Sequence, residues 1–212
     1  MDSHKIVSSN IFDYVKDEYD LELNKKLLLW GSIAPDVLPK YRLKSHYPDQ
    51  SVGFVGHELV KITLFLQTMQ KSESFSRLLL NKLSRKIGTT SHFLADFFCY
   101  PHNANISCLT RSSTKKHMTY EADLNKYAKT HEFDLNLRQA WPDERFSGGI
   151  LDLRSYFIEN IENILALYRE EPLSFAKDLD YAANINLYLL SLAFELAEEM
   201  SPQLQKEAAH MI

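Results

Sequence analysis

Histidines and carboxylates recur at helical spacing between Ser91 and Glu121. His92 and Asp96 are four residues apart, and so are His117 and Glu121. On a helix this spacing places both side chains of a pair on one face, with their Cβ atoms roughly 5–6 Å apart. Each pair could therefore bind one metal ion through an imidazole nitrogen and a carboxylate oxygen.

His102 lies between these two pairs. The residues around His92 include Phe93, Leu94 and Phe97, which predicts a largely buried helix. A buried imidazole or carboxylate is costly unless it is paired or bound to metal. The alternative is two ordinary surface pairs on unrelated helices, and the apolar surroundings of His92 disfavour it.

The remaining candidates for this site share the same ligand chemistry. Imidazole nitrogens and carboxylate oxygens without a thiolate suit zinc, and also manganese or iron. Cys99 is expected to pack as a small apolar side chain, His131 to be solvated and His210 to lie in a tail, while His57 is either a ligand or a residue near a helix start. The candidate metal ligands are His4, Asp36, His46, His92, Asp96, His102, His117 and Glu121.

Composition places the chain among ordinary globular proteins. With 45% hydrophobic and 25% charged residues, 212 residues suffice for one domain. The net charge of −4 and the pI of about 6.1 argue against a stable nucleic-acid partner bound through a strongly basic face. No run approaches the roughly 18 apolar residues of a membrane span. Residues 1–10 do not read as a signal peptide, so we expect a cytoplasmic protein, or a secreted one if a signal peptide has been removed.

The spacing of apolar residues predicts an all-α single domain, residues 1–212, of about seven helices packed around a metal cluster. No segment alternates as a strand would. We expect a long structured loop over residues 31–56, which hold three prolines and three glycines. Gly88 would cost about 1 kcal/mol within a helix, which suggests close approach of another backbone. The expected helices cover residues 4–19, 21–30, 57–70, 72–100 (one helix or two), 117–141, 150–168 and 172–200, before a tail at 201–212.

Five motifs in this order resemble the zinc-dependent phospholipase C family: SHKIVSSN, APD, SHY, HFLADFFCYPHN and HMTYE. That family includes bacterial phosphatidylcholine-hydrolysing phospholipases and the catalytic domains of clostridial alpha-toxins. Single-strand nucleases of the S1/P1 type share the fold. By motif, the resemblance covers about residues 3–121, and its most specific part is H-x3-D-x5-H followed by H-x3-E.

The resemblance implies an all-helical fold with two or three Zn²⁺ ions at the base of a cleft. The ligands it implies for one ion are Asp36, His46, His92 and Asp96. Those for a second ion are His102, His117 and Glu121. A third ion would bind His4 and Asp96, so that Asp96 bridges two ions.

The third ion departs from the family pattern. In the secreted relatives it is also held by an N-terminal tryptophan upstream of the histidine. Here only three residues precede His4, and none is a tryptophan. The N-terminus could reach the ion by a shorter path, Asp2 could replace it, or the third site could be empty.

The activity that the resemblance implies is hydrolysis of a phospholipid or a small phosphodiester. Adjacent zinc ions would polarise phosphoryl oxygens and lower the pKa of a water toward ~7, and Asp36 could act as general base. Peripheral membrane contact could come from Phe54, Val55 or Phe146. The alternatives are an S1/P1-type nuclease, which the acidic pI disfavours, and a non-catalytic metal-stabilised helical protein.

Overall fold

The computed structural model describes residues 2–41, 44–70, 77–106, 109–141 and 145–199. Within these ranges the chain forms nine α-helices and two short 3-10 helices, with no strand. The all-α prediction is therefore confirmed. The tail expected at residues 201–212 lies outside the described residues.

Seven of the helices correspond to the seven expected from apolar spacing. They are α1 (Asp2–Tyr19), α2 (Lys25–Gly31), α4 (Pro48–Gln70), α5 (Arg77–Phe97), α7 (Arg111–Tyr127), α8 (Leu153–Glu170) and α9 (Phe175–Glu199). Two single-turn helices, α3 (Ala34–Val37) and α6 (Tyr100–Asn103), were not predicted, because four residues are too few to show a period. The 3-10 helices span Pro39–Tyr41 and Leu137–Ala140.

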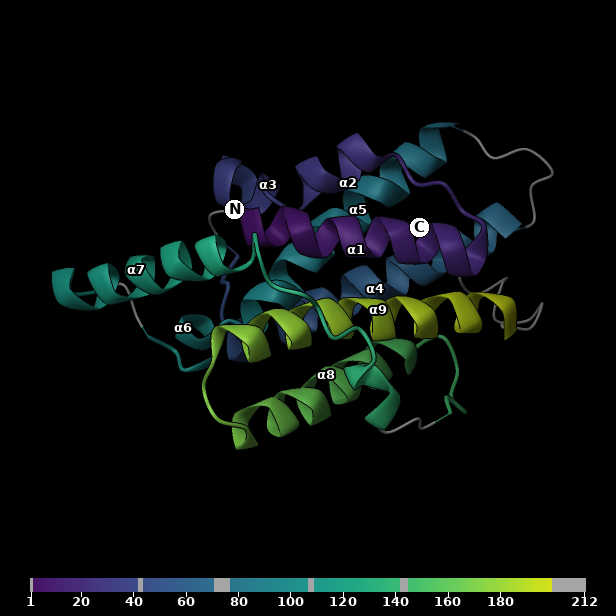
Figure 1. Cartoon of the computed structure of the whole chain (residues 1–212). Coiled ribbons are helices and arrows are strands. Elements are labelled where there is room, and N and C mark those ends of the chain that lie inside the picture. Colours follow the sequence, from purple (N-terminus) through teal and green to yellow (C-terminus); the bar gives the residue numbers. More distant parts are fainter. Residues whose placement is uncertain (1, 42–43, 71–76, 107–108, 142–144, 200–212) are drawn as a thin grey trace.

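The long helices α1, α4, α5, α8 and α9 run alongside one another (Figure 1). Helix α4 packs against α5, α8 and α9, and α9 also packs against α1 and α5. Helices α3, α6 and α7 gather at the end of the bundle where the chain begins (Figure 1). The candidate ligands come from this end.

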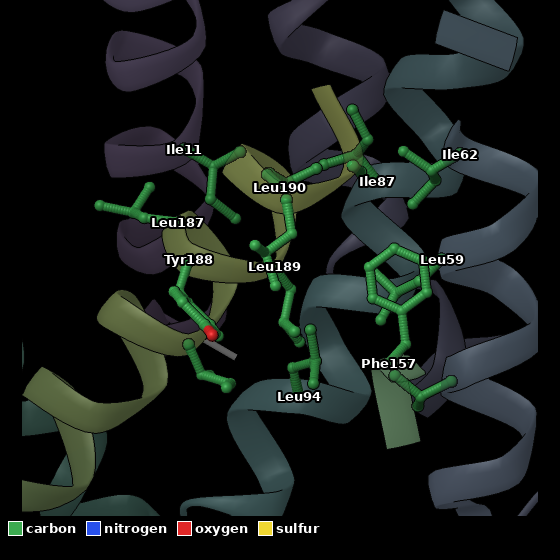
Figure 2. Close-up of a cluster of buried hydrophobic side chains, with 14 of the residues drawn as sticks. Ile11, Leu59, Ile62, Ile87, Leu94, Phe157, Leu187, Tyr188, Leu189 and Leu190 are labelled. Carbon is green, nitrogen blue, oxygen red and sulfur yellow. The ribbon is translucent and has the colours of Figure 1, made fainter. Parts of the chain in front are cut away.

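One large apolar core joins α1, α4, α5, α8 and α9 (Figure 2). Its members are almost fully buried, and each large aliphatic or aromatic side chain buried in this way contributes roughly 1.5–3 kcal/mol. The core side chains labelled in Figure 2 are Ile11, Leu59, Ile62, Ile87, Leu94, Phe157, Leu187, Tyr188, Leu189 and Leu190.

Helix α7 lies outside this main core. Its buried residues are His117 and Leu124. Leu124 belongs to a second, small cluster that it forms with Cys99, Ala128 and Leu179. In Figure 1, α7 accordingly projects beyond the end of the bundle.

The close backbone approach expected at Gly88 is present. A Cβ atom at this position would collide with the carbonyl oxygen of Leu28 and lie 3.0 Å from the Cα atom of Gly31. At Gly31, a Cβ atom would lie 2.6 Å from the carbonyl oxygen of Arg85. The two glycines therefore allow α2 to touch the backbone of α5, one turn before His92.

The loop expected over residues 31–56 was wrong in its second half, because α4 begins at Pro48. Proline suits the first turn of a helix, where its missing N–H has no intrahelical acceptor. Gly53 and Gly56 are helical rather than loop residues. A Cβ atom on Gly56 would lie 2.8 Å from Cγ1 of Ile158, so this glycine allows α4 to approach α8 closely.

Helix α7 also has different ends from those predicted, since it begins at Arg111 and ends at Tyr127. Its start is a capping box, in which Thr110 and Ser113 each accept a hydrogen bond from the other's backbone N–H. The sequence before His117 is polar, and this polarity indicated a loop. The segment is polar because only one narrow face of α7 contacts the rest of the protein. Thr110 was the signal that could have located this start.

Candidate metal centre

The eight candidate ligands gather near the start of α1, which carries His4. Helices α3, α6 and α7 lie at this end of the bundle (Figure 1). The ligands come from five helices and one connecting segment: His4 from α1, Asp36 from α3, His46 from the segment before α4, His92 and Asp96 from α5, His102 from α6, and His117 and Glu121 from α7. A cavity of about 230 Å³ is lined by His4, Asp36, His46, Asp96, His102 and Glu121, together with apolar residues of α1, α5, α7 and α9.

Asp96 is the centre of the arrangement. Its Oδ2 atom lies 2.6 Å from Nδ1 of His46 and 3.2 Å from Nε2 of His92. Its Oδ1 atom lies 3.4 Å from Nε2 of His4 and 3.9 Å from Nε2 of His102. The side chain is buried, so one carboxylate faces histidines on two sides. This is the geometry of a ligand that could bridge two ions.

Two overlapping triads surround His92. His46, His92 and Asp96 form one, and His4, Asp36 and His92 form the other; within each triad the ligand atoms lie within 4.8 Å of one another. Nε2 of His92 is 3.2 Å from Nδ1 of His46 and 3.4 Å from Oδ1 of Asp36. The family resemblance predicted that His4 shares an ion with Asp96 rather than with Asp36 and His92. His4 is also close to Asp96, with 3.4 Å between Nε2 and Oδ1.

A third triad consists of His102, His117 and Glu121. Oε1 of Glu121 lies 2.9 Å from Nε2 of His102 and 3.0 Å from Nε2 of His117. The two imidazole nitrogens are 3.3 Å apart. His117 and Glu121 are close because they are four residues apart on α7. His102 lies on α6 and comes near them only through the tertiary fold.

Backbone carbonyls orient two of these rings. Nδ1 of His92 lies 2.9 Å from the carbonyl oxygen of Ser32, and Nδ1 of His117 lies 3.2 Å from that of Ile106. A carbonyl only accepts hydrogen bonds, so each Nδ1 carries a proton. Each Nε2 then faces the cluster, where it can donate to a carboxylate when protonated or bind a metal ion when neutral. Such outer hydrogen bonds are typical of histidines that bind metal.

The pKa shifts agree with a ligand set. Burial alone would raise the pKa of Asp96, but the imidazoles of His92 and His102 outweigh it and hold that pKa well below its usual range. Burial also opposes ionisation of Glu121, yet hydrogen bonds from the imidazoles lower its pKa to about 2. For His4, burial and the neighbouring His92 lower the pKa to about 3, so this imidazole is neutral.

The residues fit a divalent cation. Nε2 of His92 and Nε2 of His117 each lie close to another imidazole nitrogen and to a carboxylate oxygen. A divalent cation at these atoms would replace the protons through which the imidazoles otherwise pair with the carboxylates. Nitrogen and oxygen donors in this number suit Zn²⁺.

A family model described as zinc dependent phospholipase C matches residues 3–197. The chain belongs to the zinc-dependent phospholipase C family. The match extends past the motifs into α8 and α9, and this membership supports metal-dependent phospholipase chemistry. No curated protein and no solved structure matches the chain.

Two histidines of this zinc-dependent phospholipase C family member lie apart from the cluster. His57 is exposed on α4. The expectation that His131 is solvated was wrong, because its side chain is only 9% exposed and its Nε2 atom lies 2.7 Å from Oδ1 of Asp180. His210 falls outside the described residues. Cys99 is buried in the small apolar cluster, as expected.

The structure tests one alternative for the third ion, namely that Asp2 replaces the N-terminal ligand. Asp2 is exposed and pairs with Lys129 at 2.9 Å, so its carboxylate does not join the cluster. Met1 lies outside the described residues.

The apolar residues predicted to contact a membrane are instead packed within the protein. Val55 is completely buried, and Phe54 and Phe146 pack against the core. Within the described ranges, no helix is long and apolar enough to cross a membrane.

Sequence reasoning missed one residue of this site, Asp178. It lies in the first turn of α9, lines the cavity and is 1% exposed. An acidic residue at a helix start usually indicates a favourable interaction with the helix dipole. The donors to its carboxylate lie 10, 58 and 78 positions away in the chain, so no helical spacing could have identified it.

Proposed function

We propose that this protein is a zinc-dependent phosphodiester hydrolase that cleaves a phospholipid between diacylglycerol and phosphate. The observation that supports this best is the position of Asp96, whose two oxygens face separate sets of histidines. Such a carboxylate can bridge two ions, and paired metal ions are typical of enzymes that act on phosphate esters.

The proposed ion sites use the chain's own residues as follows. Asp36, His46, His92 and Asp96 hold one ion, and His102, His117 and Glu121 hold a second. His4, with Asp36 and His92 or with Asp96, supplies a third position. When bound, the ions polarise phosphoryl oxygens and make a nearby water more acidic.

Asp36 is the proposed general base. Its side chain is 32% exposed, whereas that of Asp96 is 5% exposed, so water and substrate can reach Asp36. Burial raises the pKa of Asp36 in the metal-free protein, and a bound cation would lower it again. The water oxygen bonds to phosphorus while its proton passes to the Asp36 carboxylate, and the bond from phosphorus to the diacylglycerol oxygen breaks. The leaving oxygen then takes the proton from Asp36, which releases diacylglycerol as an alcohol and restores the carboxylate.

The charge of the site favours a phosphate ester as substrate. Two or three Zn²⁺ ions would exceed the negative charge of the three carboxylates and leave a net positive pocket. A phosphodiester carries the complementary charge.

Contact with a lipid surface is assigned to the solvent-facing side of α7. Leu109 is 90% exposed and Met118 is 64% exposed. Arg111, Lys115 and Lys116 are exposed beside them, and Arg111, Lys115 and Met118 are spaced to share one helical face. Exposed apolar side chains among cations complement an anionic phospholipid surface. Because α7 also carries His117 and Glu121, such contact would bring the substrate next to the metal centre.

The test is a comparison of three substrates at equal zinc concentration: phosphatidylcholine, a soluble p-nitrophenyl phosphodiester and single-stranded DNA. We expect cleavage of the lipid and the soluble diester, with loss of activity in Asp96→Asn. Asp17→Asn is the matched control, because it makes the same change at an exposed position near the end of α1 that is far from His4. Faster cleavage of DNA would indicate a nuclease, and zinc binding without turnover of any substrate would indicate a non-catalytic protein.

A further inference from the structure

Asp178 joins three other structural elements. It is almost completely buried and accepts three hydrogen bonds. The backbone N–H of Tyr100 and the hydroxyl of Tyr120 donate to Oδ2 at 2.9 and 2.8 Å. The hydroxyl of Tyr168 donates to Oδ1 at 2.6 Å. One carboxylate of α9 thus holds the start of α6, the middle of α7 and the C-terminal part of α8.

Two of these three donors lie next to candidate ligands. Tyr120 directly precedes Glu121, and Tyr100 is the first residue of the short helix α6 that carries His102. An N–H at the start of a helix has no acceptor within that helix, so the Asp178 carboxylate satisfies it. Oδ2 of Asp178 therefore links α6, which carries His102, to α7, which carries His117 and Glu121.

Helix α7 has other attachments to the rest of the protein, including ring contacts of Tyr120 and Tyr127 with Phe175. Near the C-terminal end of α7, Asn125 accepts hydrogen bonds from the backbone N–H and the hydroxyl of Ser3, at 2.9 and 3.0 Å. Leu124 packs in the small apolar cluster rather than in the main core. Helix α7 carries two of the three ligands in this triad. The Tyr120–Asp178 contact is the one that ties α7 to α6 through a single carboxylate, because the same oxygen accepts from Tyr100.

We propose that Asp178 is a positioning residue, which holds α6 and α7 at the separation that lets His102, His117 and Glu121 share one metal ion. The proposal rests on the metal set of the proposed function. A ligand set already held in place loses less conformational freedom when the ion binds. Outer hydrogen bonds that orient ligands act in this way in other metal sites.

A purely structural role for Asp178 makes a different prediction. The hydroxyls of Tyr120 and Tyr168 contact the same carboxylate, but α8 carries no candidate ligand. Tyr120→Phe and Tyr168→Phe are therefore matched variants, because each removes one hydroxyl from Asp178. A positioning role predicts that only the first weakens metal binding, whereas a structural role predicts that both act through stability alone.

The experiment is a zinc titration of the purified full chain against a chromogenic chelator, which requires no turnover. We expect Tyr120→Phe to weaken the binding of one ion per chain by about tenfold, the lower end for outer-shell changes. Asp178→Asn should weaken the same ion further, and Tyr168→Phe should leave its affinity unchanged. Circular dichroism and melting in EDTA will show that the variants fold.

Equal zinc affinity in Tyr120→Phe and the wild type would overturn the positioning role, while leaving the proposed function intact. An equal loss in Tyr120→Phe and Tyr168→Phe would also overturn it, because the effect would then follow stability. Absence of any zinc binding by the wild-type protein would instead overturn the proposed function, and this inference with it.

Discussion

Oδ2 of Asp96 lies 2.6 Å from Nδ1 of His46, although the two residues are 50 positions apart in the chain. His46 comes from the segment before α4, and Asp96 from the end of α5. Only the folded protein brings these donors together. Metal binding at this site should therefore be coupled to folding.

The first prediction concerns chelation. Zinc at 100 times its dissociation constant should stabilise the folded protein by about 2.7 kcal/mol, and EDTA should remove this gain. For a chain of this length that corresponds to a fall in melting temperature of roughly 5–10 °C. His92→Ala and His117→Ala should abolish most of the response, and His57→Ala on the exposed face of α4 should keep it. A melting temperature insensitive to EDTA, with no bound metal, would contradict the metal centre.

The second prediction separates chemistry from metal binding at Asp36. Because Asp36 is the most accessible carboxylate of the first two triads, Asp36→Asn should lower kcat by about 10²–10⁴-fold, the usual contribution of a general base. The ion held by His102, His117 and Glu121 should remain, as shown by elemental analysis. A variant that keeps full kcat would exclude Asp36 as the base.

The third prediction concerns the contact between α2 and α5. Gly88→Ala places a Cβ atom against the carbonyl oxygen of Leu28 and should destabilise the fold by about 1–3 kcal/mol, as overpacking does. Gly53→Ala is the matched control, since its Cβ atom would meet only the movable end of the Arg154 side chain. Urea denaturation should show a lower midpoint for the first variant alone. Equal midpoints would show that the glycine contact is not required.

The fourth prediction concerns pH and the ion pairs of Glu58. Burial works to raise the pKa of Glu58, but hydrogen bonds and charge from Lys86 and Lys61, at 2.5 and 3.0 Å, hold it below its usual value of 4.5. A lowered pKa in the folded state means that the stabilisation is present above pH 4.5 and is lost as the pH falls through the folded-state value.

Glu58→Gln should therefore cost about 1–2 kcal/mol near pH 7, and the difference from wild type should shrink as the pH falls below 4.5. Denaturation in EDTA across this pH range will measure the difference in stability. Bound zinc, whose affinity also changes with pH, then makes no contribution. A difference that is independent of pH would mean that Glu58 stabilises the protein by packing rather than by charge.

The fifth prediction concerns the lipid surface. Lys115→Gln should weaken binding to vesicles of phosphatidylserine and phosphatidylcholine by about 1 kcal/mol, close to fivefold, and Met118→Ser should weaken it at any salt concentration. Leu151→Ser is the control, because Leu151 is 76% exposed at the start of α8, away from this face. Vesicle sedimentation measures binding separately from turnover. Equal effects of Met118→Ser and Leu151→Ser would exclude the α7 face.

Local geometry explains what could be predicted. The period of apolar residues predicted the seven longer helices, because a helix buries one face whatever its partners are. The spacing of His92 to Asp96 and of His117 to Glu121 predicted two ligand pairs, because residues four apart share a helical face. The motifs around these residues also predicted the family, which the match over residues 3–197 confirms.

Packing between helices decided the rest. The sequence by itself determined which residues could share a helix face, because that depends only on the backbone period. It did not determine that His46 meets Asp96, that α4 begins at Pro48, or that Asp178 holds Tyr100 and Tyr120. Those contacts depend on how close helices approach and at which angle they cross, and side chains far apart in the chain set both.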